Sequence, residues 1–389
     1  MSMNTRYAAI QASFWGSYGT LWAFIALLLG FYGFTGAQIG TVTAAATICS
    51  VFLSPAVSSF LDARPGLENR HGAMALLAAA GALSLFAWLV SPLPKAALGL
   101  CFALIGMLLA SAPPFQNAMS IDANRCGSRV VYGFCRGVGS VSYAAAVLLF
   151  GFVLERRAPT LLLPVFAVLT GCGLAAMSGF RLPPRPAEED AAAPRGAIAL
   201  LRDDPRFLLT LLGCMFFFLA HTVSNTYMNF LVGKVGGTAS AVGVGLALSA
   251  AVELPGMTLV SRLRRRFSCG FFLRFAAGAE VVKFLIYYFA PSIGFIYLAQ
   301  TMQFFQFAVY TPATVYYVAD TLPQRDQLQG QSLIYVAGSG LGAALGSFLG
   351  GQLLERSGIQ AALLLAVAAS VGSLVSFCLS TLRPAREKG

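Results

Sequence analysis

The sequence predicts an all-α polytopic membrane protein, with twelve transmembrane helices arranged as two pseudo-symmetric six-helix bundles. Hydrophobic residues make up 57% of the 389 residues and charged residues only 11%, with a mean hydropathy of +0.74. Such values lie outside the range of soluble globular proteins. Apolar runs of about 20 residues, the length that crosses a hydrocarbon layer, recur along the chain. A segment rich in Pro and charge divides them into two sets of equal size.

The first set of apolar runs predicts helices over residues 7–31, 37–61, 72–91, 95–120, 132–154 and 159–180. The second set predicts helices over residues 206–232, 239–261, 271–290, 293–319, 329–354 and 359–381. Between them, the composition of RLPPRPAEEDAAAPRGAIALLRDDPR favours a solvated connection. The predicted domains are therefore an N-terminal bundle over 1–181, a cytoplasmic linker over 182–204 and a C-terminal bundle over 205–389.

The net charge of +11 is best interpreted as a topology signal. The basic residues lie between apolar segments instead of on one polar domain, so the lipid bilayer is the expected partner and nucleic acid is not. With the N-terminus inside, the outer loops carry only Lys95, Arg156, Arg157, Lys234 and Arg356. The positive-inside rule then predicts an inner (plasma) membrane protein with both termini in the cytoplasm. We expect it to function as a monomer.

Motifs for enzymes, cofactors and metals are absent from the sequence. The eight cysteines show no CxxC and no paired extracellular spacing, so neither a disulfide framework nor a metal site is expected. The sequence also lacks GxxxxGK[ST], GxSxG and HExxH. A protein that moves a solute without a nucleotide-binding loop must use a gradient, or no energy source at all.

Two charged side chains lie deep in apolar runs. Glu253 precedes Arg262 by nine residues and Lys283 follows Arg274 by nine, which puts each roughly 13 Å from the basic turn and near the middle of a layer about 30 Å thick. A charge at that depth is costly unless it is paired or faces water, so we expect this pair to form the floor of a transport site. Glu280, three residues before Lys283, is placed to neutralise it locally, which would leave Glu253 to the substrate or a proton.

Polar side chains also recur on one face of the seventh and tenth predicted helices. His221, Asn225 and Asn229 are four residues apart, so they are expected to face a cavity. His221 either titrates near neutral pH or acts as a hydrogen-bonded spacer. The tenth helix carries three amides suited to hydroxyl recognition: Gln300, Gln303 and Gln306.

The first and fifth helices offer aromatic and basic groups. The first helix carries an aromatic platform beside a polar group on one face, at Gln11, Trp15, Tyr18 and Trp22. Such a platform suits sugar rings or aromatic solutes; core packing is the alternative interpretation. Arg136 lies seven residues beyond Arg129, about 10 Å into the layer. Its fork of donors suits hydroxyls or a carboxylate, and a structural ion pair is the alternative.

Glycine recurs at every fourth residue of GSGLGAALGSFLGG, at Gly338, Gly342, Gly346 and Gly350. A face of small residues lets two membrane helices approach closely and slide. Ordinary packing is the alternative for any single one of these glycines.

The chain resembles the major facilitator superfamily, and within it the lactose permease type oligosaccharide:proton symporters and the phenylpropionate permease-like transporters. The resemblance covers nearly the whole chain. It rests on TGAQIGTVTAAATICSVFLSPAVSSFLDARPG, NAMSIDA, YGFCRGVGS, VELPGM and LGSFLGGQLLERSGIQAA. It implies the major facilitator fold, with a substrate site between two halves that opens to alternate sides of the membrane.

The resemblance also implies roles for single residues. In the sugar symporters an acid late in helix four and an arginine in helix five hold the substrate, and these match Asp122 and Arg136. Asp122, three residues before Arg125, is also interpretable as a solvated helix end. An acid in helix eight, here Glu253, belongs to the same site and to proton coupling, and a helix-nine arginine is replaced by Lys283.

This chain departs from that pattern where the family couples protons. The helix-ten histidine and glutamate of proton-coupled lactose transport align with Gln303 and Gln306, and a helix-seven aspartate aligns with Ser224. The conserved cytoplasmic turn retains Asp62 and Arg64, which are expected to take part in gating.

The sequence thus predicts a secondary active transporter that moves a small polar organic solute, a sugar or oligosaccharide, with proton symport. The alternatives are an uncoupled facilitator and an exporter of amphipathic or aromatic compounds. Candidate proton carriers are Glu253, Glu280 and His221, of which Glu253 is preferred because Lys283 is expected to keep Glu280 ionised. The expected substrate contacts are Asp122, Arg136, Glu253, Lys283, His221, Asn225, Gln300, Gln303, Gln306, Trp15 and Tyr18.

Overall fold

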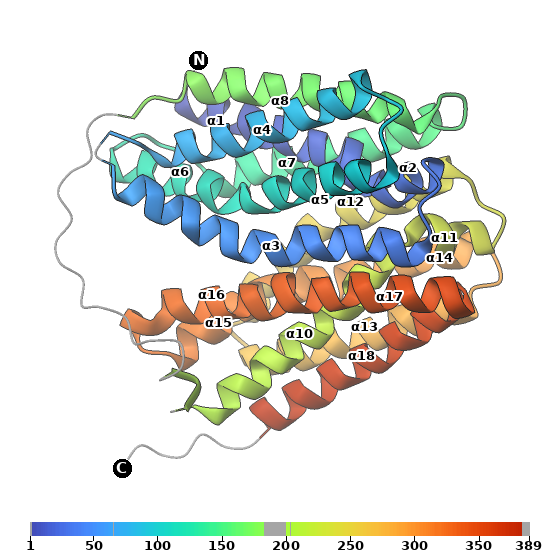
Figure 1. Cartoon of the computed structure of the whole chain (residues 1–389). Helices are drawn as coiled ribbons and strands as arrows, with labels where there is room; N and C mark the ends of the chain where they lie inside the picture. Colours follow the sequence, from blue (N-terminus) through green and yellow to red (C-terminus); the bar gives the residue numbers. More distant parts are fainter. Residues whose placement is uncertain (1, 65, 183–199, 203, 383–389) are drawn as a thin grey trace, which may run out of the picture. The chain divides into compact units, whose positions relative to one another are not determined.

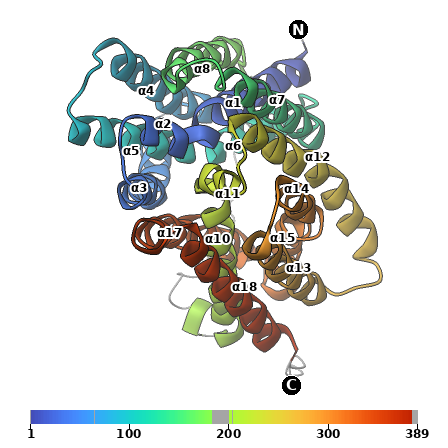
Figure 2. The same ribbon diagram turned by 90° about the vertical axis from the view of Figure 1, so that its right-hand side faces the viewer.

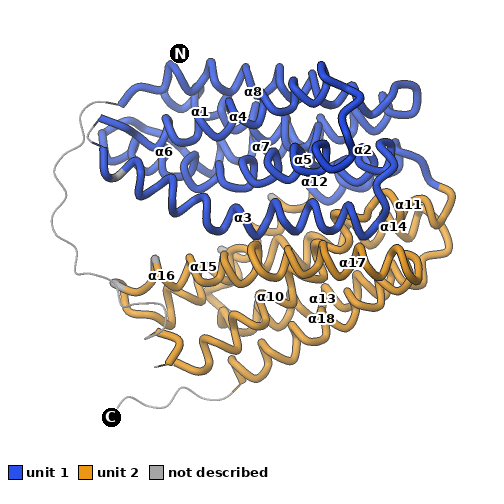
Figure 3. Tube along the Cα trace, in the orientation of Figure 1, with its two compact units in different colours: residues 1–188, 237–251 blue, residues 189–236, 252–389 orange. Residues whose placement is uncertain are grey.

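The structure, a computed structural model, describes residues 2–64, 66–182, 200–202 and 204–382, and these residues form helices without any strand (Figure 1). The chain divides into two compact units (Figure 3). Unit 1 contains residues 1–188 and 237–251, and unit 2 contains residues 189–236 and 252–389.

Unit 1 contains the first six predicted spans, two of which are interrupted. Its elements are α1 (Met3–Leu21), η1 (Trp22–Phe24), α2 (Ile25–Phe31), α3 (Gly36–Asp62), α4 (Asn69–Leu89), α5 (Lys95–Ser111), α6 (Pro113–Arg125), α7 (Tyr132–Val153), η2 (Pro159–Leu161) and α8 (Leu162–Ser178). The predicted helix over 95–120 is divided because Pro113 and Pro114 stand at the start of α6, where a helix accepts residues without an N–H. Within this unit α1 lies against α7 and α8, and α3 lies against α5 (Figure 1).

Unit 2 contains α10 (Pro205–Thr226), α11 (Met228–Lys234), α13 (Cys269–Phe289), α14 (Ile293–Thr301), η3 (Met302–Phe304), α15 (Phe307–Thr321), η4 (Gln324–Asp326), α16 (Gln327–Tyr335), the π-helical η5 (Val336–Gly342), α17 (Ala343–Ser357) and α18 (Ile359–Thr381). Side chains fix two of the helix starts. Asp204 accepts from the N–H groups of Arg206 and Phe207, and Ser268 accepts from that of Phe271. Figure 2 shows α18 beside α10 and α13.

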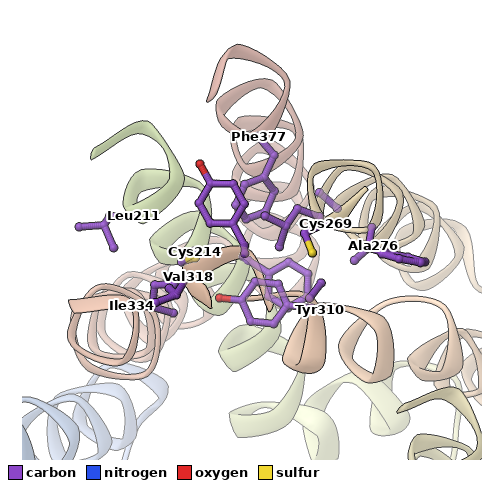
Figure 4. Packing of buried hydrophobic residues seen from close by; sticks show 14 of the residues in the cluster. Leu211, Cys214, Cys269, Ala276, Tyr310, Val318, Ile334 and Phe377 are labelled. Atoms are coloured by element: carbon purple, nitrogen blue, oxygen red, sulfur yellow. The ribbon is translucent and has the colours of Figure 1, made fainter. Parts of the chain in front are cut away.

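The core of unit 2 is an aromatic and aliphatic cluster between α10, α13, α15 and α18 (Figure 4). Tyr310 stacks on Phe217 with ring centroids 3.9 Å apart, and Phe377 is fully buried beside them. Leu200, which falls within the predicted linker, is buried in the same cluster. Leu200, with Leu201 packed against the same cluster, is therefore not solvated.

The predicted glycine face lies directly on the backbone of α10. A Cβ at Gly342 would lie against the Met215 carbonyl oxygen, and one at Gly346 would lie 2.4 Å from the Leu219 carbonyl oxygen. A Cβ at Gly338 would meet the Phe218 side chain of the same helix, and one at Gly350 would meet Val223 and also Tyr227, just beyond its end. These contacts support the expectation of a close helix approach through small residues.

The helix α12 (Ala239–Leu263) belongs to unit 1 over residues 239–251 and to unit 2 beyond them. Its first half packs on α7, where a Cβ at Gly151 would lie 3.0 Å from the Cα of Gly243. Thr238 Oγ1 donates to Glu155 Oε1 at 2.6 Å. Hydrogen bonds from Ser240 and Thr238 hold the pKa of Glu155 below its usual value.

Ten helices in the described part of the chain are long and apolar enough to cross a membrane. The two remaining predicted spans are α13, which contains three charged residues, and the segment 293–321, which is broken between α14 and α15. The helix α13 is unbroken and the second segment is broken, and the polar residues of both belong to the candidate site.

Candidate functional site

Unit 2 contains a group of polar side chains on membrane helices, which we name the unit 2 polar cluster. Glu280 and Lys283 on α13 are 0% and 1% exposed, and Gln303 and Gln306 are also buried. The cluster consists of His221, Glu253, Glu280, Lys283, Gln303 and Gln306.

Gln303 connects two charged members of this cluster. Its Oε1 accepts from Lys283 Nζ at 2.7 Å, and its Nε2 donates to Glu253 Oε1 at 3.1 Å. One amide therefore satisfies a cation and an anion at once, with its oxygen and nitrogen facing groups of the matching polarity. Glu253 itself is only half-buried.

Gln306 makes the corresponding connection between Glu280 and His221. Its Nε2 donates to Glu280 Oε1 at 3.0 Å and lies 3.5 Å from His221 Nδ1. The other ring nitrogen, Nε2, lies 2.8 Å from Asn225 Nδ2. Phe307 stacks on the imidazole with centroids 4.6 Å apart, so the ring is fixed at both edges and on one face.

The break in the tenth helix allows glutamines that are three residues apart in the sequence to lie on the same side. Residues 302–304 form a 3-10 turn between α14 and α15, and side chains three residues apart eclipse one another in that geometry. Gln300, Gln303 and Gln306 are all buried, and Gln300 Nε2 donates to Met228 Sδ at 3.3 Å. The single helix predicted over 293–319 was wrong at this point.

The expected local pair of Glu280 and Lys283 is not among the ion pairs of the described residues. Lys283 bonds to Gln303 and Glu280 bonds to Gln306. Spacing by three residues places two side chains on one helical face, but here η3 and the following turn offer each of them a partner from outside the helix.

The expected polar stripe of the seventh helix is also interrupted. His221 and Asn225 lie together in α10, which ends at Thr226, and Asn229 belongs to the separate helix α11. His221 is buried and Asn225 is exposed.

Unit 1 contains a second group, which we name the unit 1 aromatic cluster: Trp15, Tyr18 and Arg136. The Arg136 guanidinium lies over the Trp15 ring, 3.9 Å from its centroid, and Nη1 donates to Ser140 Oγ at 2.9 Å. Trp15 Nε1 donates to Gln11 Oε1 at 3.1 Å, and the rings of Trp15 and Tyr18 are 5.6 Å apart. The arginine and the aromatic platform thus belong to one arrangement.

The Trp15 ring also depends on a glycine that the sequence analysis did not single out. A Cβ at Gly139 would lie 2.6 Å from Trp15 Cδ1. Gly139 stands three residues after Arg136 in YGFCRGVGS, and this spacing predicts that the two lie on the same helical face.

The remaining predicted residues lie near the ends of the unit 1 helices. Asp122 Oδ2 accepts from Asn69 Nδ2 at 2.7 Å, which connects the end of α6 to the start of α4. The Arg64 guanidinium lies 3.6 Å from the centroid of the Phe60 ring. The side chain of Asp62 lies outside the described residues.

The described residues contain no group of three or more His, Cys, Asp and Glu side chains that could hold a metal ion. The chemistry available in both clusters is hydrogen bonding, charge and aromatic stacking. Such groups suit the binding of a polar organic molecule.

Two proteins of known sequence match part of this chain. The maltose permease of Geobacillus stearothermophilus is 31% identical over 252 residues, covering 64% of this chain and 63% of that protein. The uncharacterized transporter YwbF of Bacillus subtilis (strain 168) is 23% identical over 234 residues, covering 60% and 58%. The matched segments thus span less than two thirds of these relatives.

Two solved structures share the fold. The crystal structure of the nucleoside transporter NupG matches with a TM-score of 0.77 and 17% identity, covering 98% of this chain and 99% of that one. A bacterial homolog to the human lysosomal transporter Spinster matches with a TM-score of 0.69 and 14% identity, covering 98% and 95%. At these identities the likeness concerns the fold, and it confirms the predicted major facilitator architecture.

The relatives are transporters and not enzymes, in agreement with the prediction from the sequence. Residues 5–365 match the family model described as the MFS_1 like family. The chain belongs to this family and is a multi-pass membrane transporter of the major facilitator superfamily.

Proposed function

We propose that this transporter moves a sugar or oligosaccharide across the inner membrane by alternating access, together with a proton. The observation that carries this proposal is the pair of amide bridges in the unit 2 polar cluster. Lys283–Gln303–Glu253 and Glu280–Gln306–His221 put donors and acceptors of both kinds inside membrane helices. Intramembrane ionisable groups at this burial are characteristic of solute and proton pathways.

The chemistry of the partly exposed members suits hydroxyl groups. Glu253 of the unit 2 polar cluster is half-buried, and Asn225, which contacts His221 of this cluster, is exposed. A carboxylate and a side-chain amide together bind several hydroxyls in fixed directions. The name of the maltose permease supports a saccharide as the substrate. The unit 1 aromatic cluster offers a flat ring and a guanidinium, which suit the apolar face and the hydroxyl edge of a pyranose.

Further parts of the proposal follow from the sequence. Both termini are cytoplasmic, the halves are 1–181 and 205–389, and the monomer is the working unit. Arg64 and Asp62 are proposed to gate the cytoplasmic side. Asp122, bonded to Asn69, is proposed as a substrate contact that requires this bond to be exchanged.

Uptake by proteoliposomes tests the substrate class. We expect radiolabelled maltose to enter, to be competed by other glucosides more strongly than by nucleosides or aromatic acids, and to accumulate under an inward proton gradient. Arg136→Ala and Glu253→Ala are expected to abolish binding, whereas Glu155→Gln, a carboxylate in the turn after α7, retains it. Entry of no saccharide would contradict the proposal, and entry without accumulation would indicate a facilitator.

A further inference from the structure

The carboxyl group of Glu280 is the most enclosed charge of the unit 2 polar cluster. Its side chain is 0% exposed; Oε1 accepts a single hydrogen bond from Gln306, and Oε2 is buried without any partner. A buried carboxylate requires a counter-ion or several hydrogen bonds to keep its charge. One bond from a neutral amide is insufficient, so this enclosed site favours the uptake of a proton by Glu280.

The charges on α13 and α12 do not supply the missing partner. Lys283 stands three residues after Glu280, but its Nζ bonds to Gln303. The same amide holds Glu253. Gln303 thus connects Lys283 to Glu253, which is half-buried.

The other helices packed on α13 offer few titratable groups. His221 on α10 reaches Glu280 through Gln306, and Tyr310 follows Gln306 by four residues on α15. Asp320, at the far end of α15, bonds to Arg264. The sequences of α14 and α18 contain no Asp, Glu, His, Lys or Arg.

The amide of Gln306 can respond to a proton on Glu280. Its Oε1 is buried without a partner, while its Nε2 faces both Glu280 and His221 Nδ1. A half turn of the amide exchanges these two atoms. Oε1 would then accept from the protonated carboxyl group and from an Nδ1–H of His221, whose Nε2 accepts from Asn225 Nδ2. After the turn, Gln306 Nε2 lies where Oε1 was and has no partner there. It is a neutral group, however, so no charge is left without a partner.

We infer that Glu280, and not Glu253, carries the coupling proton, and that Gln306 and His221 follow its protonation by exchanging hydrogen bonds. This inference rests on the proposed symport and selects one of its three candidate carriers. One proton from water adds to a carboxylate oxygen of Glu280, whose charge changes from −1 to 0. His221 stays neutral with its single N–H on Nδ1, because Nε2 accepts from Asn225 Nδ2, so the imidazole needs no change of tautomer when Gln306 turns.

The two glutamates then have separate roles. Glu253 remains ionised beside the Lys283–Gln303 bridge and binds substrate hydroxyls. Glu280 changes charge and is connected to the substrate region through His221 and Asn225. Release of the proton restores the Gln306 orientation in which Nε2 faces the carboxylate.

Infrared difference spectroscopy of the purified full chain tests the protonation directly and needs no substrate. We expect a carboxylic acid carbonyl band at neutral pH, where the exposed carboxylates are ionised. The band should be lost in Glu280→Gln, shifted in Glu280→Asp and retained in the matched control Glu253→Gln. A band that persists in Glu280→Gln, or that is lost in Glu253→Gln, overturns the inference.

Transport separates this inference from the proposed function. Wild-type proteoliposomes should accumulate maltose under an inward proton gradient, and Glu280→Gln should lose the accumulation. Accumulation by both proteins overturns the role of Glu280 and leaves the symport intact. Wild-type protein that never accumulates a saccharide overturns the proposed symport, and the infrared band then decides the protonation of Glu280 alone.

Discussion

Replacing Gly346 by alanine should destabilise the protein, because α17 lies on the backbone of α10 at this position. The new Cβ would lie 2.4 Å from the Leu219 carbonyl oxygen, where Cβ atoms require at least 3.0 Å. The helices must separate by roughly 0.6 Å, and overpacking of this kind costs about 1–3 kcal/mol. An unfolding entropy of about 0.8 kcal/mol per kelvin for a chain of this length converts the loss to about 1–4 °C in Tm.

Gly278→Ala is the matched control, since nothing lies within 4 Å of a Cβ at that position of α13. Alanine should there gain helix propensity of about 0.5–1 kcal/mol, so its Tm should equal or exceed that of the wild type. Thermal unfolding can be followed with a thiol-reactive dye after the exposed cysteines are blocked, because Cys101, Cys135, Cys214 and Cys269 are buried. A Gly346→Ala protein that melts with the wild type, or no earlier than Gly278→Ala, would refute this reasoning.

Three further predictions concern polar contacts. Gln303→Leu should lower stability by about 1.5–3 kcal/mol, because it leaves a buried ammonium without its acceptor; an unchanged Tm would contradict this. Arg136→Lys should lose the hydrogen bond to Ser140 that holds the guanidinium in place, and should weaken saccharide binding about tenfold or more, measured by titration calorimetry. Equal affinity would show that the guanidinium fork is not used. The pKa of Glu155 is lowered from 4.5, so its contact stabilises the protein above that pH and is lost as the pH falls through the lower folded-state value. Thr238→Val should therefore reduce the fall in Tm on acidification below about pH 4.5, and an unaltered pH dependence would exclude the contact.

The positions of the helices were predictable from the sequence because a hydrocarbon layer requires long apolar runs. The breaks inside these helices were harder to predict. Pro113 and Pro114 signal one such break, but the 3-10 turn at residues 302–304 follows no proline or glycine in the sequence. The glutamines at and after this turn bond to side chains of other helices.

The members of the unit 2 polar cluster were also predictable, since ionisable groups in membrane helices are rare. Their pairing was not. The spacing of Glu280 and Lys283 indicates a shared face, but each side chain bonds to a glutamine more than 19 residues away along the chain. The sequence contains no signal for this choice, and the preference for Glu253 as the proton carrier depended on the local pair.

The coupling of saccharide to proton movement is tested most directly by adding maltose to de-energised proteoliposomes and recording the pH of the weakly buffered external medium. Symport predicts that saccharide flowing down its gradient carries protons inward, so the medium becomes alkaline on addition of maltose. The change should be absent with Glu280→Gln and with a saccharide that is not transported. Entry of labelled maltose into wild-type proteoliposomes without any change in external pH would contradict the account.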